Sequence, residues 1–185
     1  MLDIRPTLVP ELAMADALTV PKQTWMAVLV GAAIAFSFAL ACGMPFAALG
    51  ALAVLVFPIR QALWLAGLGW LANQVIGFGL LGYPLNVLTL AWGLSAVAAV
   101  GAAAFAIRFS GTVRIGAAFF AAWVAQQGTV FAASLVLGGT ATAFAPDVVW
   151  FIFWTNALGF AALLAVQVLG ARIGVARAPF AQAAG

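Results

Sequence analysis

Apolar residues are concentrated in six long stretches separated by short breaks, and this pattern predicts six membrane-spanning helices. The stretches cover residues 24–42, 44–59, 61–82, 85–107, 115–138 and 147–171. A helix needs about 20 mostly apolar residues to cross about 30 Å of hydrocarbon, and only the second stretch, between Pro45 and Pro58, is clearly short. We expect that stretch to stand nearly upright or to stop short of one interface. Because backbone groups in lipid must bond internally and the segments lack an alternating period, we expect an all-α bundle and no β-barrel.

The basic residues all lie on one side of this six-span arrangement. They occupy the amino-terminal segment, the 2–3 and 4–5 connections and the carboxy-terminal tail: Arg5, Lys22, Arg60, Arg108, Arg114, Arg172 and Arg177. The three opposite connections carry a single charge, Asp147. Because lysine and arginine in short loops mark the cytoplasmic side, the pattern predicts that both termini are cytoplasmic.

Composition agrees with a single membrane domain over residues 23–172. The chain is 67% hydrophobic and 6% charged, with a mean hydropathy of +1.21. Its net charge of +3 follows from the basic loops and does not indicate a nucleic-acid surface. Residues 1–22 contain acidic residues and no early apolar run, which excludes a signal peptide and leaves a cytoplasmic segment that is a surface helix or a loose tail. Residues 173–185 are expected to form a cytoplasmic tail.

Small residues recur at four-residue spacing on three of the predicted helices. Such ridges let helices approach closely in lipid. The first span carries Gly31, Ala35, Ala39 and Gly43, the fourth Ser95, Ala99 and Ala103, and the sixth Ala157, Ala161 and Ala165. For the fourth and sixth spans we expect packing inside the bundle. For the first, internal packing and a docking face for another protein are both open.

Uncharged polar and indole side chains fall at one depth, slightly outside the midplane. The third and fifth spans carry similar motifs, and the fourth and sixth add residues at the same level: Trp70, Asn73, Gln74, Trp92, Trp123, Gln126, Gln127 and Asn156. Two interpretations stand: the amides bond one another, or they line an outward-opening pocket in which indoles stack on a ring and amides bond its rim. Tyr83 and Asn86 would lie at the mouth of that pocket, beside Cys42.

Absent residue types narrow the chemistry. The chain has no histidine, no charged residue inside a predicted span and one lysine, Lys22, outside any glycine-rich loop. Imidazole-dependent catalysis, proton-coupled pumping and ATP hydrolysis by this chain are therefore disfavoured. We expect a transporter or transport subunit and not an enzyme, with any energy supplied by another polypeptide.

The predicted topology, the Ala35-xxx-Ala39 ridge and the outward polar pocket resemble the substrate-binding S-component of energy-coupling-factor vitamin transporters. The resemblance covers nearly the whole chain in architecture. It implies that Gly31, Ala35 and Ala39 dock a coupling membrane protein, which sits on two cytoplasmic ATPases in a bacterial inner membrane. It also implies that Cys42 to Pro45 border the substrate. The connection between the first two spans is shorter here than the capping loops of that family.

The chemical class of the substrate can be inferred only by elimination. A pocket without charge favours a large, mostly neutral ligand such as cobalamin or riboflavin. The chain is similar in size to the small proteobacterial cobalamin-uptake type, and its single cysteine, Cys42, could approach a cobalt centre. The alternative for Cys42 is a small buried apolar residue. Two further functions remain open: a non-transporting accessory subunit of a membrane complex and, least favoured, an enzyme acting on lipid.

Overall fold

The computed structural model describes residues 20–39, 44–82, 87–109, 114–137 and 144–176, and within these ranges the chain is helical, without strands. Each apolar stretch of the sequence corresponds to one helix. In chain order they are α2 Lys22–Ala39, α3 Phe46–Val56, α4 Ile59–Gly79, α5 Val87–Phe109, α6 Arg114–Leu137 and α8 Pro146–Arg172. The terminal segments 1–19 and 177–185 lie outside the described residues.

Four of these helices are long and apolar enough to cross a membrane: Lys22–Ala39, Ile59–Gly79, Arg114–Val136 and Pro146–Arg172. Large apolar side chains also cover the outside of the bundle, among them Phe38, Trp64, Val75, Phe105, Leu135 and Phe151. Exposed apolar surface on this scale is typical of a face that contacts lipid.

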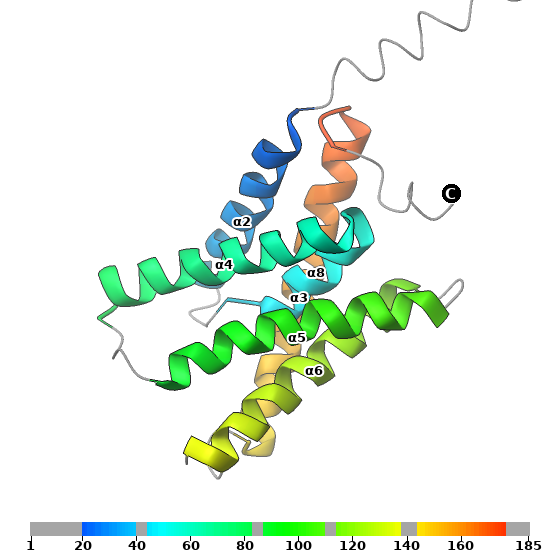
Figure 1. Ribbon diagram of the computed structural model, residues 1–185. Helices are drawn as coiled ribbons and strands as arrows, with labels where there is room; N and C mark the ends of the chain where they lie inside the picture. Colours follow the sequence, from blue (N-terminus) through cyan, green and yellow to red (C-terminus); the bar gives the residue numbers. More distant parts are fainter. Residues whose placement is uncertain (1–19, 40–43, 83–86, 110–113, 138–143, 177–185) are drawn as a thin grey trace, which may run out of the picture.

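The helices do not all run in one direction. In Figure 1, α2 begins and α8 ends at the upper side, whereas α4 and α5 lie across them, with the beginning of α4 and the end of α5 toward the right-hand side. The basic residues Lys22, Arg60 and Arg114 lie in the first turns of α2, α4 and α6, and Arg172 lies in the last turn of α8.

Helix α3 lies at the centre of the bundle, packed against α4, α5, α6 and α8 (Figure 1). Its 11 residues are all apolar, and every one except Val54 is buried. A helix that is apolar on all sides can be enclosed without burying a polar side chain, and alanines and Gly50 let its neighbours approach. A side chain at Gly50 would come within 3.3 Å of Val100 on α5, so glycine sets the spacing of α3 and α5.

Prolines bound the central helix at both ends. Pro45 is the N-cap residue of α3, and Pro58 is the N-cap residue of α4. The residue before Pro58, Phe57, is extended with φ −121° and ψ 153°, because the proline ring excludes helical backbone there. At 1.5 Å per residue α3 is about 16 Å long, so it stops short of crossing a bilayer, as its sequence indicated.

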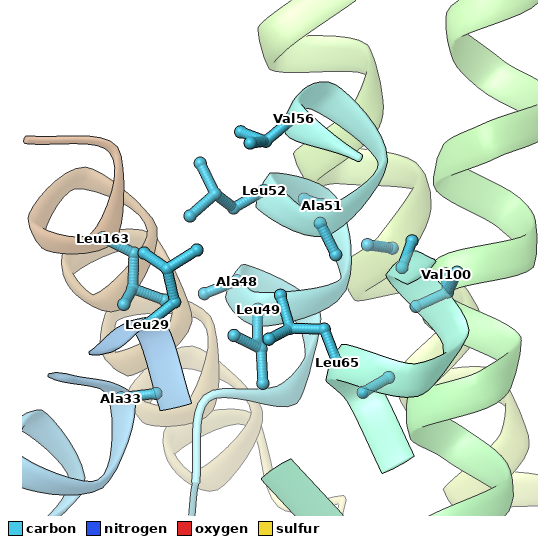
Figure 2. Close-up of a cluster of buried hydrophobic side chains, with 14 of the residues drawn as sticks. Leu29, Ala33, Ala48, Leu49, Ala51, Leu52, Val56, Leu65, Val100 and Leu163 are labelled. Carbon is cyan, nitrogen blue, oxygen red and sulfur yellow. The ribbon is translucent and has the colours of Figure 1, made fainter. Parts of the chain in front are cut away.

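The core continues from α3 into the surrounding helices. Figure 2 shows this cluster, with side chains from α2, α3, α4, α5 and α8 converging: Leu29, Ala33, Ala48, Leu49, Ala51, Leu52, Val56, Leu65, Val100 and Leu163. On α4, Gly69 lies directly against α3, because a Cβ atom there would be 2.6 Å from Cδ2 of Leu49. Small residues and leucines therefore interlock at this contact.

The beginning of α2 is fastened to the end of α8. The indole Nε1 of Trp25 donates a hydrogen bond to Oε1 of Gln167 over 2.7 Å, and both residues are buried. One turn later, Gly170 lies beneath the Trp25 ring, where an added Cβ atom would collide with two ring carbons. This bond was not anticipated from the sequence, since Gln167 belongs to no motif and lies 142 residues from its partner.

The three small-residue ridges have different surroundings. Ser95, Ala99 and Ala103 on α5 are fully buried, and the prediction of internal packing is confirmed there. For α8 that prediction is wrong, since Ala161 and Ala165 are exposed. The buried face of α8 instead combines two glycines with larger or polar residues: Thr155, Asn156, Gly159, Phe160, Leu163, Gln167 and Gly170. Side-chain size alone does not determine which face of a helix turns inward.

Candidate functional site

The predicted polar layer is divided between two sides of α3. Helix α6 packs against α3, α5 and α8, whereas α4 packs against α2, α3 and α5. Gln126 and Asn156 therefore meet on one side, while Trp70, Asn73 and Gln74 lie on the other. Gln74 is buried, and Asn73 and Gln127 are half-buried. Cys42, Tyr83, Asn86 and the side chain of Trp92 lie outside the described residues.

Gln126 and Asn156 cap the beginning of the central helix. The backbone N–H of Ala47 donates to Oε1 of Gln126 at 3.0 Å and to Oδ1 of Asn156 at 3.1 Å. Oδ1 of Asn156 also accepts from the N–H of Ala48 at 3.4 Å, and its Nδ2 donates to the carbonyl of Ile152 at 3.0 Å. The two amides thus bond the backbone of α3, an arrangement the sequence interpretation did not include.

This cap satisfies the first turn of α3 completely. The first N–H groups of a helix have no partner within the helix and need acceptors from elsewhere. Phe46 donates to the carbonyl of Met44 at 2.8 Å and Leu49 to that of Pro45 at 3.0 Å, while Ala47 and Ala48 use the amides. A buried helix that begins inside the bundle is therefore stabilised by side chains from α6 and α8, and no first-turn donor is left for an anion.

The two indoles of the predicted layer differ from these amides. Nε1 of Trp70 on α4 and Nε1 of Trp123 on α6 are both buried, and neither has a hydrogen-bond partner in the described part of the chain. The carbonyl Oε1 of Gln61 shares this property. Leaving a buried donor unpaired costs about 1–3 kcal/mol, so each indole N–H is a position where an external acceptor would bind favourably.

Trp123 belongs to a cluster of rings between α6 and α8, which we name the aromatic seam. Its members come first from α6 and then from α8: Phe119, Phe120 and Trp123, and Trp150, Phe153, Trp154 and Phe160. Phe153 is central, 5.2 Å from Trp123 in edge-to-face geometry and 5.8 Å from Trp150 in a stacked geometry. The sequence interpretation selected Trp123 alone, although the three- and four-residue spacing of these aromatics was a usable signal.

The ridge on α2 faces outward. Gly31, Ala35 and Ala39 are exposed, and an added Cβ atom at Gly31 would have nothing within 4 Å. The opposite face of α2 is buried against the bundle through Trp25, Leu29 and Ala33. The small-residue face is therefore left free for another helix or for lipid.

Among the described residues no group of three or more histidine, cysteine, aspartate or glutamate side chains could hold a metal ion. No protein-family model matches the chain, and no curated protein or solved structure matches it either.

Proposed function

We propose that this protein is a membrane-embedded subunit that binds and translocates a neutral, vitamin-like small molecule, with cobalamin as the leading candidate. The observation that carries the proposal is a buried indole donor without an acceptor in the described part of the chain on each side of α3, Trp70 on α4 and Trp123 on α6. Indoles that bond a ligand oxygen and stack on its rings suit a neutral molecule rich in amides or carbonyls. The half-buried amides Asn73 and Gln127 supply further polar contacts on the two sides of α3.

Translocation across the bilayer is energised in this proposal by a separate ATPase module. The exposed ridge of Gly31, Ala35 and Ala39 supports docking of a coupling membrane protein, as in the S-components that the sequence resembles. The positions of Arg60 and Arg114, at the beginnings of α4 and α6, support an orientation with both termini in the cytoplasm. A green fluorescent protein fused at the carboxy terminus is then fluorescent, whereas a fused alkaline phosphatase is inactive. The reverse result contradicts the orientation.

The decisive experiment is mass spectrometry and visible absorbance of the protein purified in mild detergent. We expect a stoichiometric small molecule that Asn73→Leu and Gln127→Leu each lose, while the folded fraction stays at the wild-type level. Gln23→Leu is the matched control, because Gln23 is an exposed amide in the first turn of α2. A wild-type protein that carries no ligand and binds none of the tested vitamins contradicts the carrier proposal.

The exposed α2 ridge also favours a second function, a non-transporting accessory subunit clamped into a larger complex. Gly31→Leu would then remove a stoichiometric membrane partner while leaving the fold intact, since Gly31 has open space around it. Gly116→Leu on α6 is the control, because Gly116 is equally exposed and open. A partner lost in Gly31→Leu with no ligand in the wild type favours this subunit over the carrier.

A further inference from the structure

The aromatic seam runs from the beginning of α8 toward the middle of the bundle. Trp150 lies four residues after Pro146 and Phe153 seven, about 6 Å and about 10 Å along the helix. Trp123 lies nine residues after Arg114, about 13 Å from the opposite end of the bundle. The seam therefore connects the proposed non-cytoplasmic end with the interior.

A membrane-interface role explains only the outermost ring. Tryptophans at an interface keep their N–H in contact with water or headgroups, which suits Trp150 near Asp147. Trp123 lies deeper, its Nε1 is buried, and it has no acceptor among the described residues. Phe120 and Phe153, the rings beside it, offer only their π-surfaces. Its position calls for an oxygen that the described part of the chain does not supply.

Two tryptophans that contact Phe153 from the outer part of the seam are exposed. Trp150 is stacked on Phe153 with an interplanar angle of 18° and is 60% exposed, and Trp154 is 47% exposed. Such side chains can change rotamer without opening the core. A flat molecule that takes the place of Trp150 on Phe153 would lie one ring away from Trp123, because Phe153 contacts Trp123 at 5.2 Å.

We propose that the aromatic seam binds a neutral molecule with a flat unsaturated ring and a carbonyl oxygen. The ring stacks on Phe153 in place of Trp150, and the oxygen accepts the hydrogen bond of Trp123 Nε1. Asp147, in the first turn of α8, disfavours anions at the outer end of the seam. This inference rests on the proposed carrier function. It adds the chemical class of the ligand and places the ligand on the α6–α8 side of α3.

The test uses a matched pair of probes on the full chain in lipid nanodiscs: 2-methyl-1,4-naphthoquinone, which has ring and carbonyls, and 2-methylnaphthalene, which has the ring alone. Trp123→Phe keeps an aromatic ring but removes the donor. We expect about tenfold weaker quinone binding by equilibrium dialysis in this variant and unchanged binding of the hydrocarbon. Trp64→Phe, on the exposed face of α4, leaves both affinities at the wild-type value.

A spectroscopic readout separates a bonding role from a packing role. In protein with ¹⁵N-labelled tryptophan, the Trp123 indole resonance is the one missing from Trp123→Phe. We expect quinone, and not the hydrocarbon, to shift it downfield. A resonance that does not shift with quinone overturns the proposal. The N–H then makes a weak N–H···π contact with Phe153 in place of a hydrogen bond to the ligand.

The two proposals fail in different ways. If the purified protein carries a ligand that Trp123→Phe retains fully, the seam is not its site, although the carrier function stands. If quinone binds through Trp123 but no small molecule is ever taken up or co-purified, the seam stands and the carrier function falls. Equal quinone affinities in Trp123→Phe and Trp64→Phe also overturn the seam proposal.

Discussion

The segments Trp70–Gln74 on α4 and Trp123–Gln127 on α6 carry nearly the same pattern, a tryptophan followed at three and four residues by two amides, yet the fold uses them differently. On α6 the first amide, Gln126, is buried and bonds α3. On α4 the second amide, Gln74, is the buried one, and Asn73 is half-buried. Both tryptophans keep an unpaired N–H. Similar motifs at similar depth thus acquire different roles through a rotation of the helix by about 100° per residue.

The reason lies in what each helix meets. Helix α6 faces the beginning of α3, where backbone donors need acceptors, so an amide oxygen there is stabilising. Helix α4 meets Leu49 of α3, and Met44 just before α3, through Gly69, a contact that demands close approach. The α6 motif therefore contributes a cap through Gln126, whereas α4 contributes close packing through Gly69, the residue before its motif.

Removing both caps, Gln126→Leu with Asn156→Leu, should have the largest effect on folding. The N–H groups of Ala47 and Ala48 would be left without the acceptors they now have, at about 1–3 kcal/mol for each buried unpaired donor. We expect a fall of about 3 kcal/mol in the free energy of unfolding, measured by SDS titration in mixed micelles. The control is Asn73→Leu with Gln127→Leu, which removes two amides without touching α3. Equal losses in the two double variants would contradict the capping role.

Gly69→Ala on α4 should destabilise the protein by about 1–3 kcal/mol, because the new methyl group would collide with Leu49 and press on Met44. Gly67→Ala is the matched control two residues away, where an added Cβ atom has nothing within 4 Å. Thermal unfolding followed by size-exclusion chromatography compares the two. If the two variants unfold at the same temperature, the α3–α4 contact is looser than the structure has it and Gly69 has no packing role.

Gln126→Leu alone should lower the free energy of unfolding by no more than about 1 kcal/mol, because the N–H of Ala47 still donates to Asn156. Asn156→Leu should cost more, because Asn156 also accepts from Ala48 and its Nδ2 is bonded to Ile152. The SDS titration used for the double variant measures both. If Gln126→Leu alone lowers the free energy of unfolding as much as the double variant does, the N–H of Ala47 depends on Gln126 and not on Asn156. The expected order of the two single variants would then be reversed.

The existence of the six helices and their approximate ends could be predicted, because hydrophobic length and proline positions are local properties of the chain. The short central element was visible in the same way, between Pro45 and Pro58. The depth of Gln126 and Asn156 was also predictable, since helical rise converts residue number into height. Their partners were not, because an amide can bond any donor that the fold places beside it.

An apolar, helical chain with an uncharged interior and basic residues at the beginnings of α2, α4 and α6 could be read from the sequence, because each of these properties is a sum over local residues. The packing of the helices against one another sets three further features: α3 is enclosed, the ridge of α8 turns outward while that of α5 turns inward, and Trp25 meets Gln167. Those outcomes depend on the rotation of each helix about its axis. That rotation follows from the packing of all neighbours together, and no single segment encodes it.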